Sequence, residues 1–171
     1  MMFGKATARA AAQRARLEMQ GFVGHSDEKL AEVGPWLRLV PAASVGWMAI
    51  GTLLASPALI WGLVPFAAAG AIGRSHPFDA LYNHGLRHLL GTRPLPPYGV
   101  PRRVASGVAT TWIIATALVF STGATTLGRV LGAIFVALAL LPATTDFCIP
   151  AFIFGRLFGW PVGCTRPGAV K

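Results

Sequence analysis

Charge is scarce in this sequence. Of its 171 residues only 12% are charged, whereas an ordinary soluble domain contains about 25%. Hydrophobic residues make up 54%, and a single soluble core of this length cannot bury so much apolar surface. The surplus would form large exposed patches that promote aggregation. The composition therefore argues against a soluble protein and predicts that lipid surrounds much of the chain.

The sequence motifs of common enzymes are also missing. The chain contains no GxSxG, no P-loop, no HExxH and no CxxC. Its two cysteines, Cys148 and Cys164, are too few for a disulfide framework, and we expect free thiols facing the reducing cytoplasm. Cys148 stands between Phe147 and Ile149, apolar surroundings that raise the pKa of a thiol and leave it unreactive. We therefore predict no catalytic residue and no cofactor.

Acidic residues are few beside the basic ones. The 6 Asp and Glu face 15 Lys and Arg, for a net charge of +9. In a soluble protein this excess would suggest nucleic-acid binding, but neither a recognition helix nor a zinc pattern accompanies it. The basic residues instead flank apolar segments, where they contact anionic lipid headgroups. We expect the lipid bilayer as partner and no nucleic acid.

The two ends of the chain are polar. Residues 1–35 form a basic N-terminal segment without the apolar region of a signal peptide, and residues 161–171 are predicted to be a flexible tail. From Lys5 to Met19 the segment is rich in alanine and has high helix propensity. It is either a surface helix on anionic lipid or a cytoplasmic tail. We favour the tail, because the apolar face is mostly alanine.

Between these ends, residues 36–160 are predicted to form an all-α membrane domain of about four transmembrane helices. The predicted spans form two hairpins and cover about residues 37–55, 58–72, 104–121 and 127–145. The first run is long enough, at about 28 Å, to cross the hydrocarbon core. Whether residues 58–72 cross fully or remain re-entrant is left open, because this run is short.

Two shorter segments are predicted to be interfacial helices, at about residues 75–90 and 147–159. The second carries several aromatic side chains suited to that depth. On the first, one face is apolar and is expected to meet lipid, comprising Phe78, Leu81, Tyr82, Leu86 and Leu89. The opposite face is polar and comprises Asp79, Asn83, His84, Arg87 and His88.

The basic residues predict the orientation of the chain. With four spans, residues 1–38, residues 73–103 and the C-terminal tail lie on one side of the membrane. Of the 15 basic residues only Arg129 falls on the other side. Such a bias is the positive-inside signal, so both termini are predicted to be cytoplasmic.

Few residues could carry chemistry. His84 and His88 have the spacing of two metal ligands, but no further ligands follow at a defined spacing, and we predict no metal site. Asp146 ends the last span, and a carboxylate there can belong to a proton pathway or to an ion pair. We favour the ion pair, because no second acid enters the spans. The candidate partners are Arg102, Arg103 and Arg156.

Small residues recur in the last span. Gly128 and Gly132 form a GxxxG pattern, which allows two membrane helices to approach closely. Packing within one chain and packing between two copies remain equally open.

Three motifs resemble a known family. HPFDALYNHGLRHLLGTRPLPP at 76–97, PRR at 101–103 and TTDFCIPAFIFG at 144–155 are similar to the DUF4395 family of small bacterial membrane proteins. The resemblance implies a four-helix membrane fold and no established activity. Some members carry CxxC at the FC position, which suggests thiol redox chemistry there. Here Ile149, Pro150 and Ala151 follow Cys148, so the resolving cysteine is absent.

We interpret the chain as a non-catalytic component of the bacterial inner membrane that docks a partner or supports an assembly. The partner would be another membrane protein or a second copy. The predicted interaction residues are Asp79, Tyr82, Asn83, Arg87, Arg102, Arg103, Asp146, Cys148 and Pro150. Two alternatives are a thiol- or quinone-linked redox component that uses Cys148, and a transporter of ions or small solutes.

Overall fold

The computed structural model describes residues 2–164, with side chains from residue 8 onward. All regular structure in this part of the chain is helical, which confirms the predicted all-α class. The helices are α1 (Met2–Met19), α2 (Asp27–Leu37), α3 (Leu39–Leu53), α4 (Pro57–Ile72), α5 (Pro77–Leu81), the π-helix η1 (Tyr82–Leu86), α6 (Arg87–Leu90), α7 (Val100–Ser121), α8 (Thr125–Thr145) and α9 (Ile149–Phe158).

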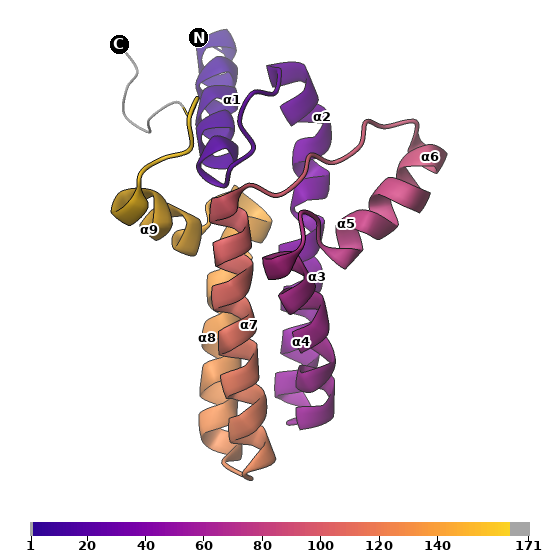
Figure 1. The fold of residues 1–171 in the computed structure, drawn as a ribbon, viewed down its shortest axis with the longest axis vertical. Coiled ribbons are helices and arrows are strands. Elements are labelled where there is room, and N and C mark those ends of the chain that lie inside the picture. Colours follow the sequence, from indigo (N-terminus) through magenta and orange to yellow (C-terminus); the bar gives the residue numbers. More distant parts are fainter. Residues whose placement is uncertain (1, 165–171) are drawn as a thin grey trace.

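The helices form a long stem with a broader head on one end (Figure 1). The stem consists of α3, α4, α7 and α8, in which α4 packs on α7 and α3 on α8. The head contains α1, α2 and the extended connector that leads into α7. At the junction, α9 projects to one side and the α5–α6 segment to the other.

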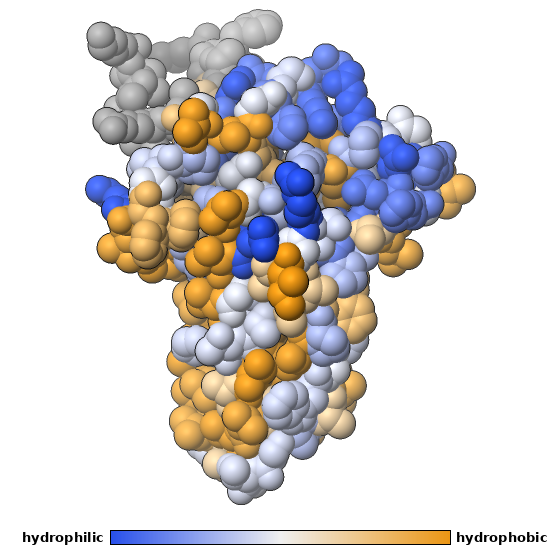
Figure 2. All heavy atoms as spheres, in the orientation of Figure 1, coloured by the Kyte–Doolittle hydropathy of each residue, from blue (hydrophilic) through white to orange (hydrophobic). Residues whose placement is uncertain are grey.

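Apolar side chains cover the stem inside and outside (Figure 2). Its interior is a cluster of buried residues that includes Met48, Ile60, Leu63, Ile113 and Phe135. Its outer surface also exposes large apolar side chains, among them Leu53 and Leu118. A helix bundle that is hydrophobic on all sides requires an apolar solvent, so the stem is the membrane-embedded part.

The structure contains fewer full-length spans than the four predicted. Within residues 2–164, α7 with 22 residues and α8 with 21 are long and apolar enough to cross a membrane. A third crossing is present if α4 and the segment after it, which are bent by 81°, count as one broken span. The predicted first span, residues 37–55, is interrupted at Arg38, and α3 has only 15 residues. Complete crossing by α3 and by α4 therefore stays a prediction.

Local capping sets the helix boundaries. The Ser56 hydroxyl accepts a hydrogen bond from the Leu59 N–H, and Pro57 occupies the first turn of α4. Pro101 takes the same position in α7, which begins four residues before the predicted 104 and so includes Arg102 and Arg103. Gly91, with φ 64°, ends α6 in the left-handed conformation.

The head has a hydrophobic core of its own. Its buried members are Leu17, Phe22, Leu30, Val33, Leu37, Tyr82, Leu95 and Tyr98. At its base Gly21, with φ +97°, meets the connector so closely that a Cβ on Gly99 would lie 2.8 Å from the Gly21 Cα. The favoured expectation of an N-terminal tail is therefore wrong. Residues 2–19 are helical, and Leu17 is fixed in a core with residues from three other segments.

The predicted amphipathic helix 75–90 is divided into three pieces. The π-helix η1 adds an extra residue to one turn and rotates the two α-helical pieces relative to each other. Leu81 and Leu89 are exposed as expected, but Tyr82 and Asp79 are buried, so the predicted lipid-facing and polar faces are both wrong at these positions. The Tyr82 hydroxyl instead lies 2.6 Å from the Thr92 hydroxyl, which ties the segment to the connector.

The GxxxG glycines pack within the chain. A Cβ on Gly132 would collide with the Thr52 side chain of α3, and one on Gly128 would meet the Phe120 ring of α7 at 2.9 Å. Of the two open alternatives, the structure shows the intrachain one.

Candidate functional site

A pocket of about 160 Å³ lies inside the stem, directly below the head. Most of its wall is apolar and comes from the three helices α3, α7 and α8, with Val40, Ala109, Trp112, Phe135 and Leu138 among its members. Small side chains create the space, because Ala105, Ala109 and Ala139 stand where larger residues would fill a bundle core.

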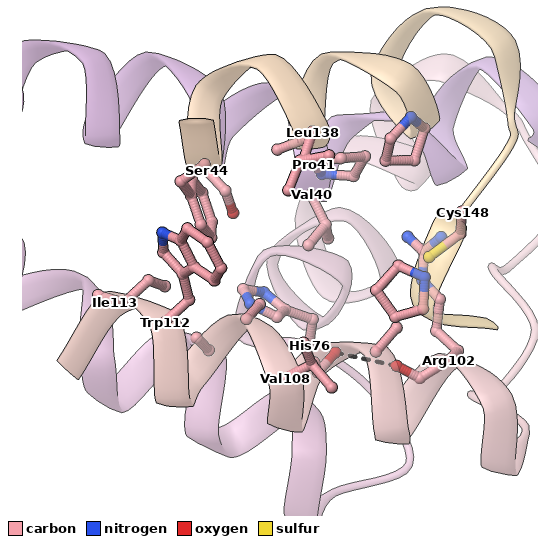
Figure 3. A pocket seen from close by; sticks show the side chains of 18 residues that line it. Val40, Pro41, Ser44, His76, Arg102, Val108, Trp112, Ile113, Leu138 and Cys148 are labelled. Carbon is pink, nitrogen blue, oxygen red and sulfur yellow. Dashed lines mark hydrogen bonds between the residues drawn. The ribbon is translucent and has the colours of Figure 1, made fainter. Parts of the chain in front are cut away.

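The end of the pocket nearest the head is polar. His76, Arg102 and Cys148 line it, and Figure 3 shows Arg102 and Cys148 together at the opposite end from Trp112 and Ile113. Ser106 adds a hydroxyl, which donates to the Arg102 carbonyl at 3.2 Å. These residues come from the turn before α5, the first two turns of α7 and the residue that precedes α9.

Arg102 is a buried cation, with only 7% of its surface exposed. Its guanidinium donates to the Leu37 carbonyl at 3.1 Å and to the Gln20 side chain. It also lies over the rings of Phe22 and Tyr98, 5.6 and 5.1 Å from their centroids. Among the described residues no carboxylate forms an ion pair with it. Its charge is thus solvated by dipoles and rings.

His76 begins α5 and points into the pocket (Figure 3). The ring Nδ1 of His76 accepts a hydrogen bond from the backbone N–H of Phe78 at 3.3 Å, and the backbone N–H of His76 donates to Asp79 Oδ2 at 3.4 Å. Burial, with the Arg102 charge, lowers the pKa of His76 to about 4. The imidazole is therefore neutral at pH 7, and since Nδ1 is an acceptor we assign the proton to Nε2.

Asp79 and Tyr98 lie behind this end of the pocket, and both are buried. Asp79 Oδ1 and the Tyr98 hydroxyl have no hydrogen-bond partner at normal distance among the described residues, although the two side chains interact with each other and with Arg102 at longer range. Burial raises the pKa of Asp79 above its ordinary value. Asp79 lies too far from Arg102 to form an ion pair with it.

Cys148 is a free thiol immediately before α9. Burial raises the pKa of Cys148, which agrees in direction with the expectation of an unreactive thiol. Pro150, in the first turn of α9, lines the pocket beside it.

The partner of Asp146 is a residue that the sequence did not suggest. Its carboxylate forms an ion pair with Arg38, whose Nε donates at 2.7 Å, and accepts from Gln13 at 3.2 Å. The expected pairing with Arg102, Arg103 or Arg156 is wrong. Arg103 donates to the Ala71 and Ile72 carbonyls at the end of α4, and Arg156 lies over the Phe152 ring.

The remaining predicted residues lie outside the pocket. His84 and His88 lie on exposed turns of η1 and α6, and within the described part of the chain no group of three His, Cys, Asp or Glu could hold a metal ion. Asn83 accepts a hydrogen bond from the Leu95 N–H, and Arg87 donates to the Asn83 carbonyl. The first contact joins η1 to the connector, and the second lies within the α5–α6 segment.

Of the predicted interaction residues, the structure thus gathers Arg102, Cys148 and Pro150 at one pocket. It adds His76 and Ser106, which the sequence did not single out. The sequence signal that contains His76 is the HPFD motif at the start of the first region of family resemblance.

Comparison with known proteins identifies a family without an assigned activity. The family model described as "Domain of unknown function (DUF4395)" matches residues 35–158. No curated protein and no solved structure matches the chain.

Proposed function

Since the chain belongs to the DUF4395 family, whose activity is unknown, we propose its function from its architecture. It is a non-catalytic accessory component of the bacterial inner membrane, with the stem in lipid and the head in the cytoplasm. The head docks a partner protein through the exposed half of α1.

One observation carries this proposal. The C-terminal part of α1 is fixed in the head core through Leu17, whereas residues 8–12 are exposed on the same rigid helix. This exposed part consists of four alanines and Arg9. Alanine keeps such a helix folded with little help from packing, and its small side chains let another helix approach closely.

The positions of the charges support the orientation. All 6 acidic residues and every basic residue except Arg129 fall outside the four stem helices or in the first turn of α7. In Figure 2 the blue, hydrophilic surface lies over the head and the α5–α6 segment, whereas the side of α9 is mostly orange. A cytoplasmic head satisfies the positive-inside rule.

The two alternatives receive less support. A dithiol reaction needs a thiolate and a resolving cysteine, but the pKa of Cys148 is raised and its neighbour at the CxxC position is Ala151. Transport needs a polar path through the stem. The hydroxyl groups of α7 do not support one, because they donate to carbonyls of their own helix, as in Thr110, Thr116 and Ser121.

Site-specific photocrosslinking in native membranes tests the docking role. A photoreactive residue at Ala8 or Ala12 should give one discrete protein adduct, and the same residue at Ala124, at the far end of the stem, should not. Arg9→Glu should weaken the adduct at Ala12. If the α1 positions give no adduct, or the same one as Ala124, the docking proposal is wrong.

A further inference from the structure

The pocket has the dimensions of a site for one slender ligand. Its volume of about 160 Å³ is close to that of an engineered protein cavity, about 150 Å³, which binds benzene. A two-chain phospholipid cannot enter it, but one ring or the first part of a single alkyl chain can.

The wall of the pocket reaches the outer surface of the stem. Val108 of α7 and Leu138 of α8 both line it, and their side chains are 48% and 44% exposed. The wall of the pocket therefore includes one residue of α7 and one of α8 that belong to the apolar outer surface of the stem. A longer chain that leaves the pocket between them meets lipid rather than water.

The polar end offers hydrogen-bond donors. Arg102 has five N–H groups, of which the contacts to Leu37 and Gln20 use two. His76 Nε2 adds a neutral donor, because Nδ1 is occupied by the Phe78 N–H. The Ser106 hydroxyl proton is directed to a carbonyl. A molecule that fits this end must supply acceptors.

The charge at this end is not balanced by an ion pair. Burying a charge is unfavourable unless an opposite charge lies against it. Among the residues described, no carboxylate does so for Arg102, and Asp79 reaches it only at longer range. An anion in the pocket would therefore contact Arg102 directly and remove this cost.

Arg102 lies in the first turn of α7, next to the head, and Trp112 lies ten residues further into the stem on the same helix. Figure 3 shows these two residues at opposite ends of the pocket. An amphiphile in the head-side leaflet has the same arrangement, with its headgroup near the interface and its chain toward the middle of the bilayer. No reorientation is needed for it to enter from lipid.

We propose that this pocket binds a single-chain anionic amphiphile, whose carboxylate or phosphate headgroup contacts Arg102 and His76 and whose chain lies along α7 and α8. The proposal is independent of the docking role, since it involves no residue of the exposed half of α1.

Quenching of tryptophan fluorescence by brominated chains provides a direct test, because Trp112 lines the pocket. The full chain in phosphatidylcholine nanodiscs is titrated with brominated dodecanoate, with dodecyl phosphate as competitor. Binding should be saturable and should quench a component that is lost in Trp112→Phe. The methyl ester of the same acid should bind at least tenfold more weakly, because it lacks the charge.

Two substitutions on α7 locate the site. Ala109→Phe fills the pocket without altering Arg102 and should abolish saturable quenching. Ala115→Phe makes the same change at an exposed position outside the pocket and should leave it unchanged. Equal binding by the two variants would overturn the assignment of the site.

Further ligands test the chemistry of the occupant. Equal affinity for the methyl ester would overturn the anionic headgroup. Competition by acetate or inorganic phosphate as strong as by dodecyl phosphate would overturn the amphiphile and leave a small-anion site. Arg102→Gln should reduce the preference for the acid over its ester, provided that the variant retains the fluorescence spectrum of the native fold.

Discussion

At the scale of single residues, a few polar side chains connect the head to the stem. Gln20 contacts two residues of the stem side: its side-chain oxygen accepts from Arg102, and its side-chain nitrogen donates at 2.6 Å to the backbone carbonyl of Asp146. Arg16 donates at 2.7 Å to the Thr145 carbonyl. The carbonyls at the C-terminal end of α8 are therefore capped by residues of α1 and its following turn, more than a hundred positions earlier in the chain.

The ion pair between Arg38 and Asp146 should be a major contribution to this connection. Asp146 is 3% exposed and Arg38 34%. Removing Arg38 therefore leaves a buried carboxylate without its cation, and removing the Asp146 charge leaves a partly hydrated guanidinium without its anion. We expect Arg38→Gln to lower the free energy of unfolding in detergent by about 2 kcal/mol. Asp146→Asn should have a similar effect, and the double variant should lose less than the sum. Additive losses would show that the two residues do not interact.

The protonation of His76 should make stability depend on pH. Its pKa of about 4 in the folded protein lies below the ordinary 6.5, so the unfolded chain takes up the proton first as the pH falls. Stability should therefore be complete above pH 6.5 and decrease from there toward pH 4. The raised pKa of Asp79 has the opposite effect on stability, because the folded chain takes up this proton first as the pH falls. This effect is the same in every variant that retains Asp79.

His76→Asn isolates the histidine. Asparagine can still cap α5 but does not titrate in this range. Thermal unfolding at pH 7.5 and 4.5 should show a smaller loss for His76→Asn than for the wild type. Equal losses in the two proteins would exclude His76 as the source.

At the scale of the elements, close contacts decide how the helices pair. The contact of Gly132 with Thr52 holds α8 against α3, and no side chain larger than hydrogen fits between them.

Gly132→Val should therefore separate the two helices and lower the free energy of unfolding by about 1–3 kcal/mol. Gly46→Val on α3 is the matched control, because a Cβ there meets nothing within 4 Å. Unfolding of both variants in the same detergent gives the comparison. If both behave like the wild type, the helices do not pack at this glycine.

Contacts between elements also explain the incorrect sequence expectations. The alanine-rich segment that forms α1 was correctly given high helix propensity, but its burial depends on Leu17 meeting residues of α2 and the connector. In the 75–90 segment, Tyr82 is buried because it packs in the head core, and η1 then alters the helical phase after it. Neither distant contacts nor a π-turn can be derived from local periodicity.

At the scale of the whole molecule, the distribution of charge supports our proposal that the head lies in the cytoplasm. Cysteine labelling in bacteria tests this placement, in a chain with both native cysteines replaced. Ala31→Cys lies on the exposed surface of α2, and Ala124→Cys lies at the far end of the stem. A membrane-impermeant maleimide should label Ala124→Cys in intact cells and Ala31→Cys only after permeabilisation. The reverse pattern would invert the proposed orientation.

The sequence alone determined that the stem helices are apolar enough for lipid, that the fold is all-α, and where most helices lie. Composition and helical propensity are local or additive properties, so they can be summed without knowing which segments meet. The tertiary structure decided the pairing of Asp146 with Arg38, the burial of Tyr82 and Asp79, and the pocket that brings His76, Arg102 and Cys148 together. These features depend on contacts between distant segments, where small differences in packing and desolvation select one partner among several.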